Sequence, residues 1–462
     1  MQNFIFMERI EPEKRGSNER KKDFKEIYTI FRTTDAMAQA DRCVQCGDPY
    51  CHSACPLHNF IPYWLKSVAG KDDELAFKLS NETNPFPEIT GRICPQDRLC
   101  EGACTLEQDG YNAVTIGSIE TYISEHGFKK GMKVTFPPLD TGKKVAIVGS
   151  GPAGFSAATY LMRAGIAVDM FEKANRPGGL LTYGIPSFKL EKEIVFRRFQ
   201  WLEEAGMKLY LNTEVGKDID FKELMESYDA VFIGIGAEAS KKANVPGENG
   251  KNVFVAIDFL KNIQQKLFGE AYDESFDVRN KNVVVVGGGD TAMDCLRTSL
   301  REGARSVKCL YRRDAHNMPG SRKEFKNAKE EGAEFLFNVT PKEVLLNDRG
   351  EVIGIEMLKT ILTKKDATGR QRVEVIENSE FRVDADVVIF ALGFNNTQPK
   401  YLFENGIEMD KWGQIQADEN MECSKPFVYT GGDCYRGSDL VVTAAYDGKI
   451  AAESMVKKLL GK

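Results

Sequence analysis

The pattern of hydrophobic and polar positions differs between two parts of the chain. Before residue 140, apolar residues recur at helical spacing around Ile61–Val68 and Ile116–Ile123, and prolines interrupt the pattern. From Lys144 onward, short apolar runs alternate with glycine-rich turns and helical stretches. Short continuous apolar strands between helices are typical of parallel α/β units. We therefore expect an α-helical domain at residues 1–140, followed by an α/β part after a proline- and glycine-containing linker.

An internal repeat indicates that the α/β part holds two nucleotide-binding domains. The segment Val145–Gly154 resembles Val283–Ala292, and Asp229–Gly236 resembles Asp386–Gly393. Each copy opens with a strand and a glycine-rich turn, and it closes with an apolar strand that ends in glycine. Two Rossmann-like domains are the natural interpretation of this repeat.

The first copy carries a full dinucleotide fingerprint. Its glycines follow the apolar strand Val145–Val148 and open the helix Ala153–Arg163, and the next strand ends at an acidic residue. The first glycine allows the tight turn, the second admits a pyrophosphate, and the third lets the helix pack on the strand. An acid at the strand end suits a ribose 2′-hydroxyl, as in FAD or NAD. The candidate contacts are Gly149, Ser150, Gly151, Pro152, Ala153, Gly154, Glu172 and, from the closing strand, Gly236.

The second copy differs at the acidic position. Its next strand, Val307–Tyr311, ends in two arginines. Guanidinium groups at this place suit a 2′-phosphate, so the sequence favours NADPH over NADH, and the alternative is a solvated basic turn. The candidate contacts are Gly287, Gly289, Asp290, Thr291, Arg312, Arg313 and Gly393.

A third glycine-rich segment lies near the carboxyl end. Phe427–Asp433 has the form of a strand that ends in Gly432 and Asp433, and a helix is expected around Val441–Met455. Such a segment can return to the first nucleotide domain and place Asp433 near the dinucleotide. We therefore expect the FAD domain at 141–278 and 395–462, with the NADPH domain at 279–394 inserted in it.

Seven of the eleven cysteines lie in the first domain. Their spacing, C-x2-C-x4-C-x3-C-P and then C-x5-C-x3-C, is related to the bacterial ferredoxin run, in which three cysteines hold one cubane cluster and the fourth reaches another. The same logic assigns Cys43, Cys46, Cys51 and Cys104 to one [4Fe–4S] cluster, and Cys55, Cys94 and Cys100 to a second. The alternative is structural zinc.

Seven thiolates cannot fill the eight corners of two clusters. The candidates for the eighth ligand are His52 and His58, which are near the cysteines in sequence, and Glu120, a lone carboxylate on the apolar helical stretch Ile116–Ile123. The residues alone leave this choice open.

Charge and composition exclude several functions. The net charge of −6 and the pI near 5.6 disfavour a nucleic-acid binder. No apolar stretch is long enough to span a bilayer, and the amino terminus lacks the features of a signal peptide, so a cytoplasmic location is expected. The alternating charges from Glu19 to Asp23 indicate a solvated helix face. No C-x-x-C motif lies near the flavin segments, so a disulfide reductase is not expected, and no hydrolase motif appears, so the chain is built to move electrons.

In these motifs and their order, the sequence resembles the small subunits of NADPH-dependent glutamate synthases. The resemblance also rests on Pro177–Pro186, with Gly179 and Leu180, a segment that it places along the flavin ring. It implies an adrenodoxin-reductase-like pair of nucleotide domains behind a helical Fe–S domain, with FAD, NADPH and two [4Fe–4S] clusters as cofactors. It also implies a non-cysteine ligand sixteen residues after Cys104, which is Glu120 here.

The same resemblance implies a function and a partner. Electrons would pass from NADPH through FAD and the clusters to a large (α) subunit, which makes glutamate from glutamine and 2-oxoglutarate, within a hetero-oligomer. Related chains serve bifurcating ferredoxin:NADP oxidoreductases and dihydropyrimidine dehydrogenase, and these remain alternatives. A subunit that keeps the fold without turnover is a further alternative, which the intact motifs disfavour.

Overall fold

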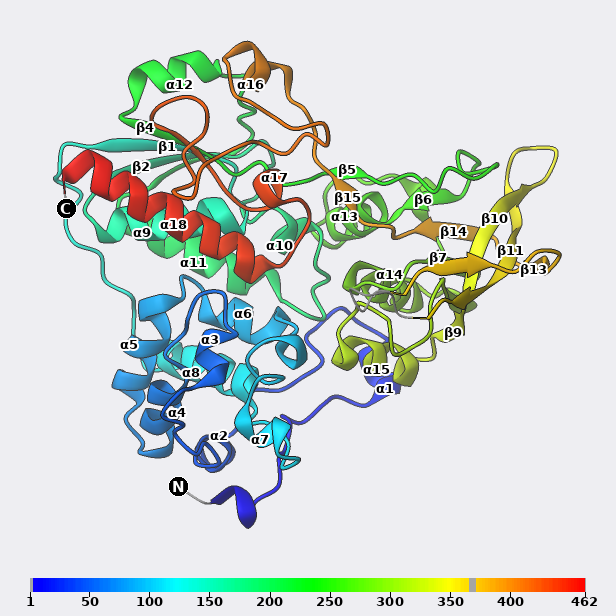
Figure 1. The fold of residues 1–462 in the computed structure, drawn as a ribbon, viewed down its shortest axis with the longest axis horizontal. Helices are drawn as coiled ribbons and strands as arrows, with labels where there is room; N and C mark the ends of the chain where they lie inside the picture. Colours follow the sequence, from blue (N-terminus) through cyan, green and yellow to red (C-terminus); the bar gives the residue numbers. More distant parts are fainter. Residues whose placement is uncertain (1–2, 365–370, 462) are drawn as a thin grey trace.

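The computed structural model describes residues 3–364 and 371–461. The chain folds into a helical amino-terminal domain and two five-stranded parallel sheets with helices packed on them (Figure 1). This arrangement confirms the predicted α/β architecture with a helical domain in front.

The helical domain is a cluster of short helices around one apolar core. The two helical patterns of the sequence form α4, which begins with Pro62 in its first turn and ends before Gly70, and α8, which runs six residues beyond the predicted Ile123. Trp64 and Ile119 are almost completely buried where these helices meet. The helices are α2 (Thr33–Ala40), α3 (Tyr50–Ser53), α4 (Ile61–Ala69), α5 (Asp73–Thr83), α6 (Pro87–Ile93), α7 (Thr105–Gln108) and α8 (Ile116–Lys129).

The first sheet has the strand order β16-β4-β1-β2-β3, and all its neighbours are parallel. Its strands are β1 (Lys144–Val148), β2 (Ala167–Phe171), β3 (Lys208–Tyr210), β4 (Ala230–Ile233) and β16 (Val428–Thr430). Side chains alternate between the two faces, so Val145 and Ile147 pack toward one helical layer while Ala146 and Val148 pack toward the other. The helices around it are α9 (Pro152–Arg163), α10 (Leu180–Tyr183), α11 (Lys192–Glu204), α12 (Phe221–Ser227), α16 (Lys400–Glu404), α17 (Asp433–Arg436) and α18 (Val441–Leu460).

The second sheet repeats this design with the order β6-β14-β7-β8-β9, again parallel. Helices cover one face and an antiparallel β layer covers the other. The strands are β6 (Val253–Val255), β7 (Asn282–Val286), β8 (Ser306–Tyr311), β9 (Glu334–Phe337) and β14 (Val387–Phe390), with β10 (Val339–Leu346), β11 (Val352–Leu362), β12 (Val373–Val375) and β13 (Phe381–Val383) in the antiparallel layer. The helices are α13 (Ala256–Leu267), α14 (Asp290–Arg301) and α15 (Arg322–Glu331).

The chain crosses between the two sheets twice. The strand β16 lies beside β4, and α18 packs along α9, so the last segment of the chain completes the first sheet (Figure 1). The crossings themselves pair as a short antiparallel ribbon of β5 (Ala239–Ser240) and β15 (Phe394–Asn395). Within the described part of the chain, no helix combines the length and the apolar character that crossing a membrane requires.

The amino-terminal segment leaves the helical domain and lies against the second nucleotide unit. The one-turn helix α1 (Ser17–Arg20) contacts α15, and the phenol of Tyr28 donates a hydrogen bond to Asn327. The predicted solvated helix face is wrong for Arg20, whose side chain is only 1% exposed. Arg20 pairs with Glu330 and Glu331 of α15 at 2.9 and 2.8 Å. A buried guanidinium requires such partners, and they lie too far along the sequence for a local pattern to reveal them.

The carboxylate of Glu331 is the centre of this contact. It accepts hydrogen bonds from Arg297 and Arg301 of α14 and also pairs with Arg20. Burial alone would raise the pKa of Glu331, but the hydrogen bonds and charges of the arginines outweigh burial and hold the pKa below its usual range.

We expect Glu331→Gln to lower the free energy of unfolding by about 3–5 kcal/mol, because buried Arg301 would lose its carboxylate partner and Arg20 and Arg297 would each lose one of two. Urea denaturation followed by circular dichroism measures the change. The matched control is Glu334→Gln, since Glu334 is 63% exposed and its pair with Lys308 spans 3.6 Å, so about 0–1 kcal/mol is expected there. Equal effects of the two substitutions would contradict the assigned role of Glu331.

Candidate functional site: two nucleotide turns and two cysteine sets

The three glycines of the turn after β1 differ in the space around them. A Cβ atom added to Gly149 would lie 2.4 Å from the carbonyl oxygen of Gly234, and one added to Gly154 would lie 2.1 Å from that of Gly149. A Cβ atom on Gly151 would meet nothing within 4 Å. Packing therefore requires the first and third glycines, whereas the second faces open space at the start of α9. That space fits a phosphate group at a helix amino terminus.

The turn after β7 repeats this geometry. Gly287 has φ +147°, and its added Cβ atom would lie 2.3 Å from the carbonyl oxygen of Ala391. Gly289 again faces open space, and Ala292, which stands at the third position, is completely buried. Asp290 and Thr291 form the first turn of α14. The carboxylate of Asp290 accepts a hydrogen bond from the backbone of Ser321 at 2.9 Å.

The acid at the end of β2 lies beside the first turn. Glu172 is buried, and its carboxylate accepts hydrogen bonds from the backbone and the hydroxyl of Ser150 at 3.0 and 2.5 Å and from the backbone of Ala174 at 2.8 Å. The turn and the strand end thus form one unit, in which Pro152 and Ala153 begin α9.

The two arginines after β8 differ in their exposure to solvent. Arg312 is exposed, and Arg313 is partly buried. The Nε atom of Arg313 is buried without a hydrogen-bond partner among the described residues. A buried donor without a partner is costly, so this group fits an anionic ligand such as a phosphate.

The third glycine-rich segment closes over the first turn. Gly432 has φ +76°, and a Cβ atom there would lie 2.9 Å from that of Ala153 in α9. Asp433 begins α17, and burial raises its pKa to about 7. Gly236 lies after β4 with open space around it, and Gly393 lies after β14.

Sequence reasoning missed a buried acid in α18. Asp447 is completely buried, accepts a hydrogen bond from the backbone of Gly432 at 2.9 Å, and pairs with Arg436. Its signal in the sequence is a lone carboxylate on an apolar helix, the same signal that singled out Glu120.

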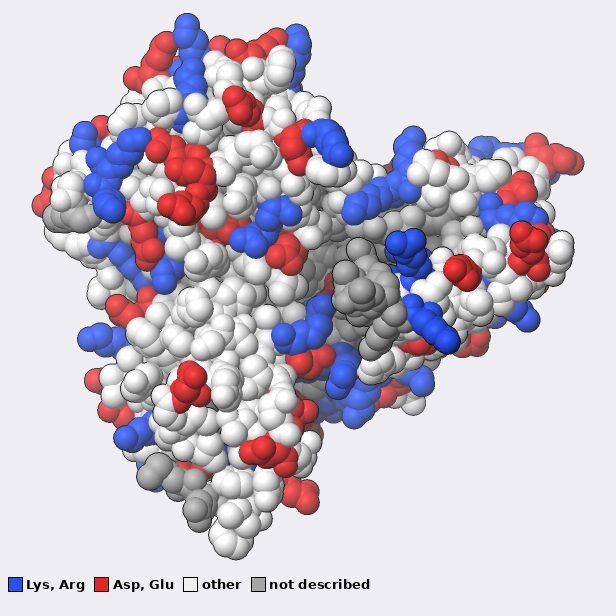
Figure 2. All heavy atoms as spheres, in the orientation of Figure 1, with Lys and Arg blue, Asp and Glu red and all other residues white. Residues whose placement is uncertain are grey.

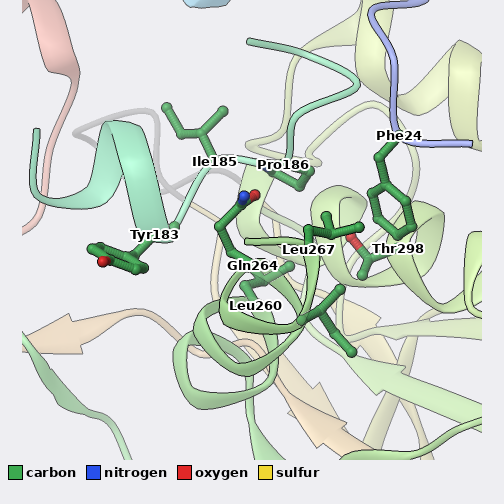
Figure 3. Close-up of a pocket in the computed structure, with 10 residues that line it drawn as sticks. Phe24, Tyr183, Ile185, Pro186, Leu260, Gln264, Leu267 and Thr298 are labelled. Carbon is green, nitrogen blue, oxygen red and sulfur yellow. The ribbon is translucent and has the colours of Figure 1, made fainter. Parts of the chain in front are cut away.

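The segment Pro177–Pro186 contacts both the first glycine turn and helix α13 of the second sheet. Gly179 lies against the first turn, where an added Cβ atom would be 3.1 Å from the Cα atom of Gly151, and Leu180 begins α10. Farther along, Tyr183, Ile185 and Pro186 face Leu260 and Gln264 of α13 across a small cavity, which Phe24 also lines (Figure 3).

The first four cysteines of the predicted sorting line one hollow. Cys43, Cys46, Cys51 and Cys104 line it together with Tyr50 and apolar residues of α4 and α8. We call these four cysteines the outer set. Burial is the main cause that raises the pKa of Cys43 to about 11 and that of Cys51 to about 12. Buried thiols of this kind become thiolates only when a cationic centre compensates them, which fits a metal cluster.

The other three predicted cysteines form a second group, of which Cys55 is buried and Cys94 and Cys100 are partly buried. Burial is the main cause that raises the pKa values of Cys55, Cys94 and Cys100 above the usual range, and the charge of Glu120 contributes to each shift, after that of Glu101 in the case of Cys100. The carboxylate of Glu120 is thus close to all three, and we call the three thiols and this carboxylate the inner set. The four cysteines of the outer set line one hollow, as their predicted grouping requires, and the role of both sets as cluster ligands stays a prediction.

The burial and contacts of the three candidates for the eighth ligand distinguish Glu120 from the two histidines. Glu120 is buried, and burial raises its pKa to about 8 despite hydrogen bonds from Thr90 and Asn84. His58 is exposed, and His52 has its Nδ1 atom 3.0 Å from the backbone carbonyl of Asn59. Within the described residues, no three His, Cys, Asp or Glu side chains form a site for a single metal ion.

Two family models match the chain. Residues 20–132 match the 4Fe–4S cluster domain II of dihydropyrimidine dehydrogenase, and residues 143–448 match the pyridine nucleotide-disulphide oxidoreductases. The small chain of NADPH glutamate synthase from Escherichia coli is 48% identical over 99% of this chain and 98% of its own length. The corresponding chain from Azospirillum brasilense is 44% identical over 98% and 95%. This chain belongs to the glutamate synthase small-chain family.

Two further comparisons concern a relative with another name and a solved structure. The putative oxidoreductase AegA of Escherichia coli is also 48% identical, over 97% of this chain but 69% of its own length. Among solved structures, FprA from Mycobacterium tuberculosis, seen in complex with NADPH, has a TM-score of 0.58 at 21% identity and covers 70% of this chain and 85% of its own. That likeness confirms the fold of the nucleotide-binding part of this family member.

We expect Gly151→Ala and Gly289→Ala to act on ligand binding and not on folding, because an added methyl group meets only open space in each turn. Gly151→Ala should reduce FAD retention after gel filtration, and Gly289→Ala should weaken NADPH binding, measured by calorimetry. Each variant is the control for the other. Loss of both nucleotides from either variant, or a lower unfolding temperature of the nucleotide-free chain, would contradict the assignment of the two turns.

Proposed function

We propose that the chain is the NADPH-oxidising electron-transfer subunit of a glutamate synthase. The observation that supports this best is that one chain, alignable over its whole length with glutamate synthase small chains, presents two open glycine turns and two cysteine sets. Dinucleotides fit the turns, and clusters fit the sets.

Each cofactor has residues that would hold it. FAD would bind at Gly149–Gly154 and Glu172, and NADPH would bind at Gly287–Ala292 with Arg312 and Arg313. Two [4Fe–4S] clusters would use the outer and the inner set. Together these groups supply hydride acceptance from NADPH and onward transfer of single electrons.

The residues of the chain orient these groups. The ammonium group of Lys192 donates hydrogen bonds to the backbone carbonyls of Leu181, Ile185 and Leu190, which fixes the segment proposed to lie along the flavin. Burial lowers the pKa of Lys192 to about 7. Asp433 begins α17 directly after Gly432, which packs against Ala153 in the first turn of α9, so Asp433 would border the same cofactor.

The burial of the two sets suggests the direction of transfer. Cys55 and Glu120 of the inner set are buried, whereas the hollow of the outer set lies beside Tyr50, which is 57% exposed. The surface around α3 carries few charged side chains (Figure 2). We therefore place the exit for electrons at the outer set, where a partner protein would dock.

The partner in this proposal is the large subunit, in a hetero-oligomer that forms glutamate from glutamine and 2-oxoglutarate. In the NADH glutamate synthase of Schizosaccharomyces pombe, the part that matches this chain is 23% of a longer protein, at 36% identity. The overall reaction would belong to the complex, and a cytoplasmic location stays a prediction of the sequence.

A second candidate is an oxidoreductase with another electron acceptor. AegA matches this chain at the same identity as the Escherichia coli small chain, and the cluster model bears the name of dihydropyrimidine dehydrogenase. The relay of cofactors would be the same, so only the acceptor distinguishes the two functions.

The test compares the anaerobically purified chain with and without the matching large subunit. Alone, it should hold about eight iron and eight labile sulfide atoms, reduce artificial acceptors with NADPH, and form no glutamate. With the large subunit it should form glutamate. Cys94→Ser should abolish glutamate formation but spare reduction of dyes by the flavin, and Cys423→Ser, which changes a cysteine outside both sets, should spare both activities.

Stoichiometric zinc without sulfide would contradict the cluster assignment. Glutamate formation by the chain alone, or by cluster-free variants with the partner, would contradict the relay. Electron transfer to ferredoxin or a pyrimidine, without any restoration of glutamate formation, would favour the second candidate.

We expect replacement of both Arg312 and Arg313 with Ala to weaken NADPH binding by at least 10-fold and to leave NADH binding nearly unchanged. Charge-assisted hydrogen bonds are worth about 1.5–3 kcal/mol each, and about 1.4 kcal/mol is a factor of ten. Titration of each nucleotide measures both effects. Arg305→Ala is the matched control, since Arg305 is exposed just before the amino end of the same strand. Equal losses for both nucleotides would mean that the arginine pair is structural.

A further inference from the structure

The carboxylate of Glu120 accepts hydrogen bonds from three neutral side chains that belong to three different elements. We call these three donors, Asn59, Asn84 and Thr90, the cradle. The Oε1 atom of Glu120 accepts hydrogen bonds from the Nδ2 atoms of Asn59 and Asn84 at 3.2 and 3.1 Å. Its Oε2 atom accepts one from the hydroxyl of Thr90 at 3.1 Å. Asn59 precedes α4, Asn84 ends α5, and Thr90 lies in α6, so the cradle joins three helices to α8. All four side chains are at least nine-tenths buried.

Other contacts fix the orientation of the two amides. The Oδ1 atom of Asn84 accepts a hydrogen bond from the backbone of Phe86, and its second amide proton goes to the hydroxyl oxygen of Thr90 at 2.7 Å. The Oδ1 atom of Asn59 accepts one from the hydroxyl of Thr83 at 2.9 Å. Neither amide can exchange its oxygen and nitrogen without breaking these contacts, so both Nδ2 atoms are fixed on Glu120.

The hydrogen bonds leave one carboxylate oxygen partly free. An ionised carboxylate has about four acceptor positions, two on each oxygen. Two amide donors fill those of Oε1, whereas Oε2 has the single contact from Thr90. No Lys, Arg or His nitrogen of the described residues lies within 4.0 Å of this carboxylate. A buried carboxylate with neutral donors only, near the three thiols of the inner set, still needs a cationic partner.

We propose that Asn59, Asn84 and Thr90 are positioning residues that present Oε2 of Glu120 to the inner cluster and set the reduction potential of that cluster. The proposal rests on the proposed function, because it takes the inner set as cluster ligands. The three donors withdraw charge from the carboxylate, so they stabilise the more negative, reduced cluster. Their removal should lower the potential of the inner cluster alone.

The experiment uses the full chain with its cofactors, purified anaerobically. Redox titration followed by electron paramagnetic resonance gives the potential of each cluster, and Cys94→Ser identifies the signal of the inner one. Thr90→Val removes the hydroxyl donor at nearly constant volume. We expect it to shift the inner signal to lower potential and to make its iron about 10- to 100-fold easier to remove with a chelator. The outer cluster and the flavin should keep their potentials.

Two further variants make the result specific. Thr90→Ser keeps the hydroxyl and should restore the wild-type potential. Thr121→Val removes a hydroxyl from the neighbouring residue of α8, where it bonds only the backbone of Gly117 at 3.0 Å, and it should change neither cluster. If Thr90→Val does not fold, Asn59→Ala provides the same test through Oε1 and should shift the potential in the same direction.

The outcomes separate this inference from the function on which it rests. A wild-type chain without iron and sulfide would overturn both. A wild-type chain with two clusters that NADPH reduces, combined with an unmoved inner potential in Thr90→Val or Asn59→Ala, would overturn only the positioning role. Equal shifts of both clusters, or the same shift in Thr90→Ser or Thr121→Val, would also overturn it.

Discussion

Buried pairs of arginine and glutamate fix the helical domain against both nucleotide-binding units, and every route for electrons depends on these contacts. On one side, Arg198 of α11 pairs with Glu88 of α6 in a contact where both side chains are at least 95% buried. On the other side, Arg20 pairs with Glu331. A buried ion pair adds little net stability, because desolvation offsets the attraction, but an unpaired charge in the same place is very costly. Such pairs therefore specify one relative placement of the domains more than they stabilise it.

Because these ion pairs fix the placement of the domains, the amino-terminal part of the chain both contacts the second nucleotide unit and builds the core of the helical domain. Its charged residues contact α15 far from the helical domain, whereas residues from Thr33 onward build the core around the cysteines. The first sheet is held by additional polar contacts to backbone carbonyls, where Arg163 donates to Asn81 and Glu82, and Tyr160 donates to Thr83. The ends of α5 and α9 thus lie together, beside the cradle of Glu120.

Sequence reasoning succeeded where the chemistry requires a fixed spacing. The repeated glycine turns predicted both sheets and the open positions Gly151 and Gly289, because a pyrophosphate-binding turn tolerates few alternatives. The cysteine spacing also grouped Cys43, Cys46, Cys51 and Cys104, which line one hollow. It failed where the partner is distant in sequence and the residue type is common. Nothing local marks Arg20 as buried, and Asn59, Asn84 and Thr90 resemble ordinary polar residues until α8 brings Glu120 to them.

The short peptide between Cys51 and Cys55 sets a limit on the distance between the two cysteine sets. Four residues span at most about 14 Å when fully extended and about 6 Å when helical. Cys51 lies in α3, and the chain continues in a tight turn through Ala54 to Cys55, so the shorter value applies to their backbones. One of these residues belongs to the outer set and the other to the inner set. The next residues reach Asn59, which donates to Glu120. A single segment of nine residues therefore links the hollow of the outer set, the thiols of the inner set and the carboxylate, and it keeps the two sites close whatever motion the nucleotide domains undergo.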